Sequence, residues 1–112
     1  MRIESTTIAR AFIDGRAVKG RRTYTDGHAL WLHHNRIAWW LNEERTMLAV
    51  CCQGRPTVTT KDRLNTILYN LGLPRSFYTR NYQLYFHNSL RPVDAREVIA
   101  INVPLARELL AA

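Results

Sequence analysis

The fold of this chain is decided by residues 22–52, whose sequence is RTYTDGHALWLHHNRIAWWLNEERTMLAVCC. Short runs of β-branched, aromatic and other apolar residues alternate there with turn residues, and Asp26-Gly27 is a strong hairpin signal. Short β-prone runs separated by turns are typical of an antiparallel meander. We expect its four strands at residues 22–25, 29–33, 36–41 and 46–52, with turns at 26–27, 34–35 and 42–45.

Alternation along these strands assigns side chains to the two faces of the sheet. On this register Trp31 and His33 share a face, and so do Ile37 and Trp39. Trp40 then lies opposite Trp39, and both cannot point into one core. One of the two tryptophans is therefore expected to face outward or to lie under another element.

An amphipathic helix is expected directly after the meander. Four apolar residues recur at helical spacing and form one stripe, namely Leu64, Ile67, Leu68 and Leu71. Thr59-x-x-Asp62 resembles a capping box at the start of the helix, and Gly72 followed by Pro74 ends it. The opposite face is expected to be polar and solvated, and it carries Lys61, Arg63, Asn65, Thr66 and Asn70.

The N-terminal segment 5–14, STTIARAFID, is expected to form a short helix. Serine and threonine precede it, Gly15 follows it, and its apolar residues fall at i, i+3 and i+4. An edge strand is the alternative interpretation. Residues 15–22 contain two glycines and four basic residues with little apolar content, so we expect a basic loop.

The C-terminal part is expected to contain a hairpin and a short helix. Residues 77–79 and 82–87 alternate with period two around the turn Arg80-Asn81. Asp94-x-x-Glu97 can start a helical turn, whereas the residues from Val98 are β-branched, so the sequence leaves strand and helix open there. A final helix is expected at residues 104–110 because proline suits the first helical turn.

The expected fold class is therefore α+β. An antiparallel meander of about four strands packs against one amphipathic helix, a hairpin extends or completes the sheet, and short helices lie at the termini. The length of 112 residues suits one domain. We expect it to consist of an N-terminal helix and basic loop (1–20), a core (21–88) and a tail (89–112).

Composition excludes several classes of protein. With 46% hydrophobic residues the chain is globular in composition, and its net charge of +7 excludes a DNA mimic. The longest apolar run, Ile37–Leu41, is far shorter than the roughly 18 residues of a membrane span, so no membrane association is expected. Residues 1–10 lack the apolar segment of a signal peptide, which favours a soluble, intracellular protein.

The cysteines and histidines give little indication of catalysis. Cys51 and Cys52 are adjacent and would point to opposite faces of a strand, so we expect two small buried hydrophobic residues in a reducing compartment. There is no Cys/His spacing for a metal, and no cofactor motif, so neither a metal nor a cofactor is expected. We expect no enzyme. The alternative is a metal-free hydrolase that pairs His33 with His87 as acid and base.

Basic residues are the remaining functional signal. The chain has 14 arginines and 2 lysines, and guanidinium groups suit phosphates and carboxylates. The alternative is that these residues are spread over the surface and serve solubility. We expect the binding residues to be Arg16, Lys19, Arg21, Arg22, Arg55, Lys61, Arg63, Arg75 and Arg80, with Trp40, Tyr78 and Tyr85 as interleaved aromatic residues.

The segment Thr57–Thr60 allows a further interpretation. Helix N-termini bind phosphate, and Lys61 would assist. Plain helix capping is the alternative, because the Asp62 carboxylate would compete for the same backbone donors.

Three segments resemble a family of small bacteriophage-encoded proteins, namely AFIDG (11–15), LWLHHNRIAWW (30–40) and GRPTVTTKDRLN (54–65). The resemblance covers about residues 9–88. It departs from the family at His34, where the usual residue is Gly, and in the tail from Arg91, which looks additional. It implies a phage accessory protein made in the cytoplasm of an infected bacterium, and it transfers no catalytic residue.

The combined expectation is a non-enzymatic protein that acts by binding. Its partner would be a host protein or a nucleoprotein complex that it redirects or inhibits, as in host takeover or in anti-CRISPR-like inhibition of a host defence system. The alternative is direct binding of DNA or RNA through an arginine-rich face. The sequence leaves the identity of the target and the oligomeric state open.

Overall fold

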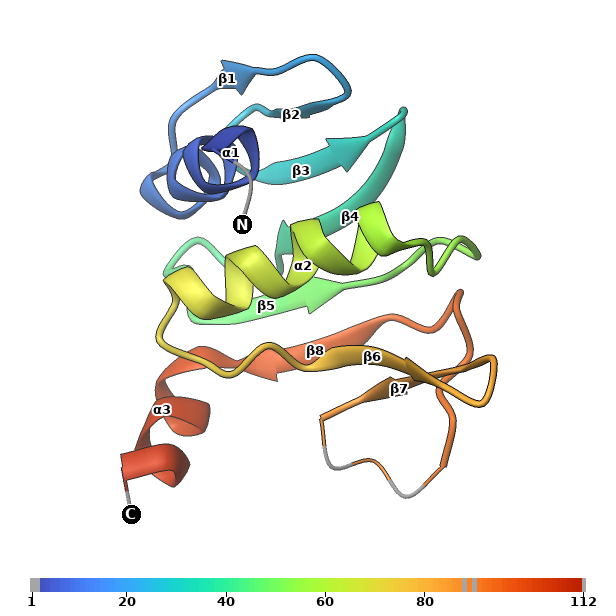
Figure 1. Ribbon diagram of the computed structural model, residues 1–112. Helices are drawn as coiled ribbons and strands as arrows, with labels where there is room; N and C mark the ends of the chain where they lie inside the picture. The colour runs from blue at the N-terminus through green and yellow to red at the C-terminus, as the bar shows by residue number, and fades with distance from the viewer. Residues whose placement is uncertain (1–2, 88, 90, 112) are drawn as a thin grey trace.

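The computed structural model describes residues 3–87, 89 and 91–111 and has the predicted α+β architecture. These residues form three helices and eight strands, which follow one another as α1 (Ile3–Asp14), β1 (Val18–Lys19), β2 (Thr23–Thr25), β3 (Ala29–Leu32), β4 (Asn35–Trp40), β5 (Met47–Val50), α2 (Val58–Asn70), β6 (Phe77–Arg80), β7 (Gln83–Phe86), β8 (Ile99–Asn102) and α3 (Val103–Ala111) (Figure 1). None of the described helices is long and apolar enough to cross a membrane.

The predicted meander is confirmed, and the structure extends it at both edges. Six antiparallel strands pair in the order β1-β2-β3-β4-β5-β8. The prediction that residues 15–22 form only a loop is wrong, because Val18 and Lys19 pair with Thr25 and Tyr24. Two residues are too short a strand to produce a periodic sequence signal. At the other edge the tail forms β8, which settles the open question about the residues from Val98.

The hairpin β6–β7 does not extend the main sheet, contrary to expectation. It forms a two-stranded sheet of its own, because β8 already pairs with the free edge of β5. Asn65 of α2 holds the hairpin instead: its side-chain oxygen accepts from the backbone N–H of Ser76 (2.9 Å) and Phe77 (2.8 Å). The turn lies at Asn81-Tyr82, one residue later than predicted, and both have positive φ.

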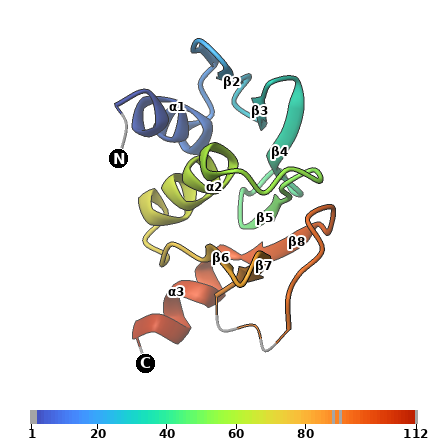
Figure 2. The ribbon, with the colours of Figure 1, turned by 45° about the vertical axis from the view of Figure 1, so that its right-hand side comes forward.

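One face of the six-stranded sheet carries the core. α1, α2 and the hairpin all lie on this side, and no described element covers the other side (Figure 2). The predicted apolar stripe of α2 is confirmed, because Leu64, Ile67 and Leu68 are fully buried. They pack with residues of α1 and of the inner face of the strands.

A bulge in β4 decides which of the two adjacent tryptophans faces the core. The register between β3 and β4 shifts at Leu30/Trp31, and as a result Ile37 and Ala38 are both buried. The prediction that Ile37 and Trp39 share a face is therefore wrong. Trp40 faces inward and stacks on Phe12 of α1 at a centroid distance of 5.4 Å, which leaves Trp39 on the outer face.

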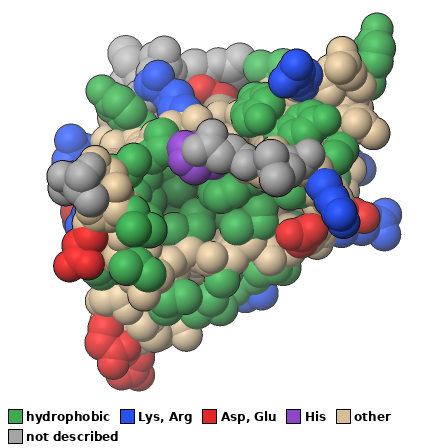
Figure 3. Space-filling view, turned by 90° about the horizontal axis from the view of Figure 1, so that it is seen from below, with side chains coloured by type: hydrophobic (Ala, Val, Ile, Leu, Met, Phe, Trp, Pro, Cys, Tyr) green, Lys and Arg blue, Asp and Glu red, His purple; other side chains and the backbone are tan. Residues whose placement is uncertain are grey.

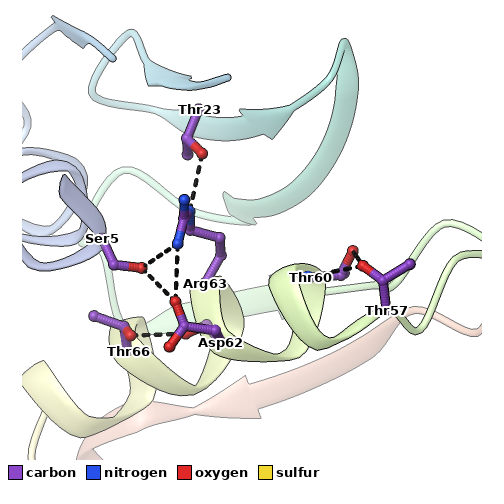
Figure 4. A network of polar contacts seen from close by, with 7 residues as sticks. All are labelled: Ser5, Thr23, Thr57, Thr60, Asp62, Arg63 and Thr66. Atoms are coloured by element: carbon purple, nitrogen blue, oxygen red, sulfur yellow. Dashed lines mark hydrogen bonds and ion pairs between the residues drawn. The ribbon is translucent and has the colours of Figure 1, made fainter. Parts of the chain in front are cut away.

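The polar face predicted for α2 is partly wrong, because two of its members are buried. Arg63 is 5% exposed and Thr66 is 1% exposed. Arg63 Nε donates to Thr23 Oγ1 on β2 (3.0 Å), and Arg63 Nη1 donates to Ser5 Oγ on α1 and to Asp62 Oδ2, both at 2.8 Å (Figure 4). Ser5 Oγ also donates to Asp62 Oδ2 (2.8 Å). The buried guanidinium thus connects both helices to the sheet.

The capping box predicted at Thr59-x-x-Asp62 is also wrong. The N-cap is Thr57, whose hydroxyl accepts from the backbone N–H of Thr60 (3.2 Å), and the Asp62 carboxylate belongs to the Arg63 network. Gly72 follows the helix with φ +80°, as predicted for a residue past a helix C-terminus.

The Arg63 network makes a testable prediction about stability. Arg63→Ala should lower the free energy of unfolding by about 3–5 kcal/mol, because it leaves the part-buried Asp62 carboxylate without its cation and removes the donor to the buried hydroxyls of Ser5 and Thr23. Urea denaturation measures this. Arg10→Ala, on the exposed side of α1, is the matched control and should change stability by less than about 0.5 kcal/mol. Equal effects of the two substitutions would show that the network does not hold the fold together.

Candidate nucleic-acid interface

A basic hollow of about 470 Å³ lies where the β1–β2 loop meets the β3–β4 turn. We call this cavity the basic hollow, and none of the residues that line it is acidic. They are Lys19, Gly20, Arg21, Arg22, Tyr24, His33 and His34. The backbone N–H of His33 donates to the carbonyl of Arg22 (3.0 Å) and so holds the turn against the loop. Lys19, Arg21 and Arg22 are cationic, and cationic groups gathered in one place attract an anion.

The turn in this hollow has a left-handed backbone, as the hairpin turn at Asn81-Tyr82 does. Leu32 pairs with Asn35, so the two-residue turn consists of His33 (φ +50°) and His34 (φ +69°). The predicted turn His34-Asn35 is therefore wrong by one residue, because Asn35 already belongs to β4. Two consecutive left-handed residues are characteristic of the hairpin turns that favour Asn-Gly. Side chains other than glycine cost free energy in this conformation, so the turn is strained.

A second hollow of about 250 Å³ adjoins the first, since His33 lines both. Arg55, Asn35 and the threonines at the start of α2 also line it. The predicted competition by Asp62 for the helix donors is wrong, because its carboxylate lies in the Arg63 network.

Cys52 also lines the second hollow. Burial, together with the neighbouring Cys51, raises the pKa of the Cys52 thiol to about 11, so the thiol is protonated at neutral pH. Both cysteines are buried and unbridged, as predicted.

The uncovered face of the sheet carries aromatic and basic side chains of which only Lys19 was predicted from the sequence. Thr23, Thr25, Leu30 and Leu32 are buried on the inner face, so the alternating residues between them point outward. These residues and their neighbours in register form an outer-face stripe across β1–β4, which consists of Lys19, Tyr24, Trp31, Arg36 and Trp39. The period-two pattern contained this signal, but choosing the outward face requires knowing where the helices pack.

Three of the predicted binding residues lie together at this site, and Arg55 lies in the adjoining hollow. Lys19, Arg21 and Arg22 line the basic hollow. Arg16 does not join them; it is exposed and pairs with Asp14 at 3.3 Å.

The other predicted residues lie elsewhere. Lys61 Nζ donates to Thr79 of β6 (2.5 Å), and Arg75 lies 4.5 Å from the ring centroid of Tyr69. Arg80 is exposed at the end of β6, and Tyr78 and Tyr85 stack on the hairpin at 5.4 Å. Arg63 lies in the core, and Trp40 lies under α1.

The two histidines considered for acid–base chemistry line different hollows. His33 belongs to the two hollows described above, whereas His87 lines a separate one beside α3. Among the described residues, no group of three or more His, Cys, Asp or Glu side chains is placed to hold a metal ion.

Comparison with known proteins places the chain in a phage family. The model of the family described as Kyanoviridae Gp96 protein matches residues 1–101. The chain belongs to the Kyanoviridae Gp96 protein family. It is thus a phage protein, and the matched segment extends past the resemblance noted from the sequence to include most of β8. The prediction that the tail from Arg91 is additional to the family is therefore wrong for residues 91–101, which the family model matches. No curated protein and no solved structure matches the chain.

The left-handed turn of this Gp96 family member makes a prediction about strain. His34→Gly should raise the free energy of unfolding by about 1 kcal/mol, because glycine adopts positive φ without the steric cost that other residues have there. Chemical denaturation measures the change. His34→Ala is the matched control: it keeps a Cβ in the left-handed conformation and should bring no such gain. A His34→Gly protein no more stable than His34→Ala would contradict the strain.

Proposed function

We propose that this phage protein acts by binding nucleic acid and that the basic hollow holds its phosphate groups. The observation that carries the proposal is the convergence of Lys19, Arg21 and Arg22 with His33 and His34 in a hollow without acidic residues. Contacts to phosphate fix the position of a protein on nucleic acid and are made by such side chains. The net charge of +7 favours the same partner over long range.

The proposed activity is binding without catalysis. The protonated thiol of Cys52 is a poor nucleophile, and His33 and His87 line separate hollows, which supports this part of the proposal. For a phage protein that binds nucleic acid, the proposed place of action is the cytoplasm of the infected bacterium. There it would act on nucleic acid itself or on a complex that handles it.

A second candidate function is binding of a host protein, and α3 favours it. Leu105, Leu109 and Leu110 are 49%, 69% and 53% exposed on this helix. Leu109 and Leu110 line an apolar hollow of about 390 Å³, on a face where hydrophobic side chains gather (Figure 3). Exposed apolar surface of this kind marks interaction sites.

Affinity capture from host lysate with and without nuclease separates the two candidate functions, because a direct protein partner is retained after nuclease treatment.

Binding through the basic hollow predicts a specific salt dependence. Replacing Lys19, Arg21 and Arg22 together by Ser should weaken binding to all sequences alike, because phosphate contacts carry no sequence information. It should also reduce the slope of log affinity against log salt concentration by about 2–3, because each lost phosphate contact contributes roughly 0.7–0.9 to that slope. Fluorescence anisotropy with labelled oligonucleotides measures both.

Arg16→Ser is the matched control for this triple variant. It removes a nearby arginine that lies outside the hollow and pairs with Asp14, so affinity and salt slope should stay close to those of the unmodified protein. If the unmodified protein binds neither DNA nor RNA at low salt, the proposal is wrong, and binding of a host protein becomes the leading candidate.

A further inference from the structure

We infer that the nucleic acid is single-stranded and that its bases stack on the outer-face stripe. This inference rests on the proposed function and names the class of ligand. The stripe begins in the basic hollow, since Lys19 and Tyr24 belong to both, and it continues across the uncovered face through Trp31, Arg36 and Trp39. Phosphates held in the hollow would therefore direct the adjoining nucleotides onto this face.

The first part of the stripe is a stacked aromatic pair. The rings of Tyr24 and Trp31 lie 5.1 Å apart at an interplanar angle of 9°, and both side chains are partly exposed. Their strands pair directly, so the backbone fixes the position of the rings. Aromatic rings held on a sheet are the usual platform for unpaired bases, because every base has a π face.

The second part of the stripe is a stacked cation. The Arg36 guanidinium lies 4.0 Å from the ring centroid of Trp39, and Arg36 is an exposed residue. Trp39 pairs with Ala29 on one side and with Ala49 on the other, so its neighbours in register on this face are both small. A guanidinium plane stacks with bases as an aromatic ring does, and it also neutralises phosphate charge.

Charge also favours a polyanion on this face. The residues assigned to the outer face of β1–β5 and β8 are Lys19, Tyr24, Ala29, Trp31, Arg36, Trp39, Met47, Ala49, Ala100 and Asn102, and none is acidic. A surface of aromatic and cationic groups without carboxylates is complementary to bases joined by phosphates.

The geometry favours a single strand over a duplex. A duplex keeps its bases paired and stacked inside, so it would reach only the cations of the site and would leave the rings of Tyr24 and Trp31 unused. The stripe crosses four strands, or roughly 14 Å at about 4.8 Å between neighbours. Stacked nucleotides of one strand rise about 3.4 Å each along the helix axis, so this length suits roughly four stacked nucleotides.

The test compares single-stranded with double-stranded oligonucleotides on substituted proteins. Trp31→Leu removes the aromatic platform and should raise the Kd for single strands about fivefold or more, while the Kd for duplex changes little. Trp31→Phe keeps an aromatic ring and should retain most of the affinity. Circular dichroism and thermal unfolding confirm that both variants fold.

Tyr78→Leu is the matched control on the hairpin. Tyr78 stacks on Tyr85 at 5.4 Å and 10°, a geometry close to that of Tyr24 and Trp31, but this pair lies outside the stripe. Its loss should leave the affinity unchanged.

In a Trp31→Phe/Trp39→Phe protein the only tryptophan is Trp40. Because Trp40 lies under α1, its fluorescence should not respond to oligonucleotide.

The outcomes separate this inference from the proposed function. No binding of either form at low salt would reject both. Equal affinity for both forms, with no effect of Trp31→Leu, would overturn the inference and leave the phosphate-binding hollow in place. A loss on Tyr78→Leu instead of Trp31→Leu would also overturn it and assign the bases to the hairpin. Preference for single strands that Trp31→Leu abolishes and Trp31→Phe retains supports the inference.

Discussion

The structure depends on one buried guanidinium. Arg63 lies within α2, and its donors reach Thr23 on β2, Ser5 on α1 and the neighbouring Asp62. A charge removed from water destabilises a fold unless its partners have good geometry. Because these partners come from three elements, satisfying Arg63 fixes how both helices lie against the sheet.

Placing both helices on one side of the sheet also defines the surface on the other side. The inward ring of Trp40 packs on α1, and Asn65 binds the hairpin on the same side as the helices. An antiparallel sheet can leave its second face in contact with water. Here that face carries the outer-face stripe, so the contacts that build the core also decide which aromatic residues remain accessible.

The basic hollow has a local cost in its turn. His33 and His34 have left-handed backbones, and such strain lowers the stability of the folded state. Lys19, Arg21 and Arg22 line the same hollow. The polyanion proposed to bind there would stabilise the folded protein by mass action, so its binding would be coupled to folding.

The sequence by itself determined the strands of the meander, the apolar stripe of α2 and the burial of both cysteines, because period and turn residues are local properties. The tertiary structure decided the burial of Arg63, whose hydrogen-bond partners Thr23 and Ser5 lie 40 and 58 positions away in the chain. It also decided that the tail pairs with β5 and that Trp39 rather than Trp40 faces outward. Periodicity shows that the two sides of an element differ, but only packing against distant segments decides which side is covered.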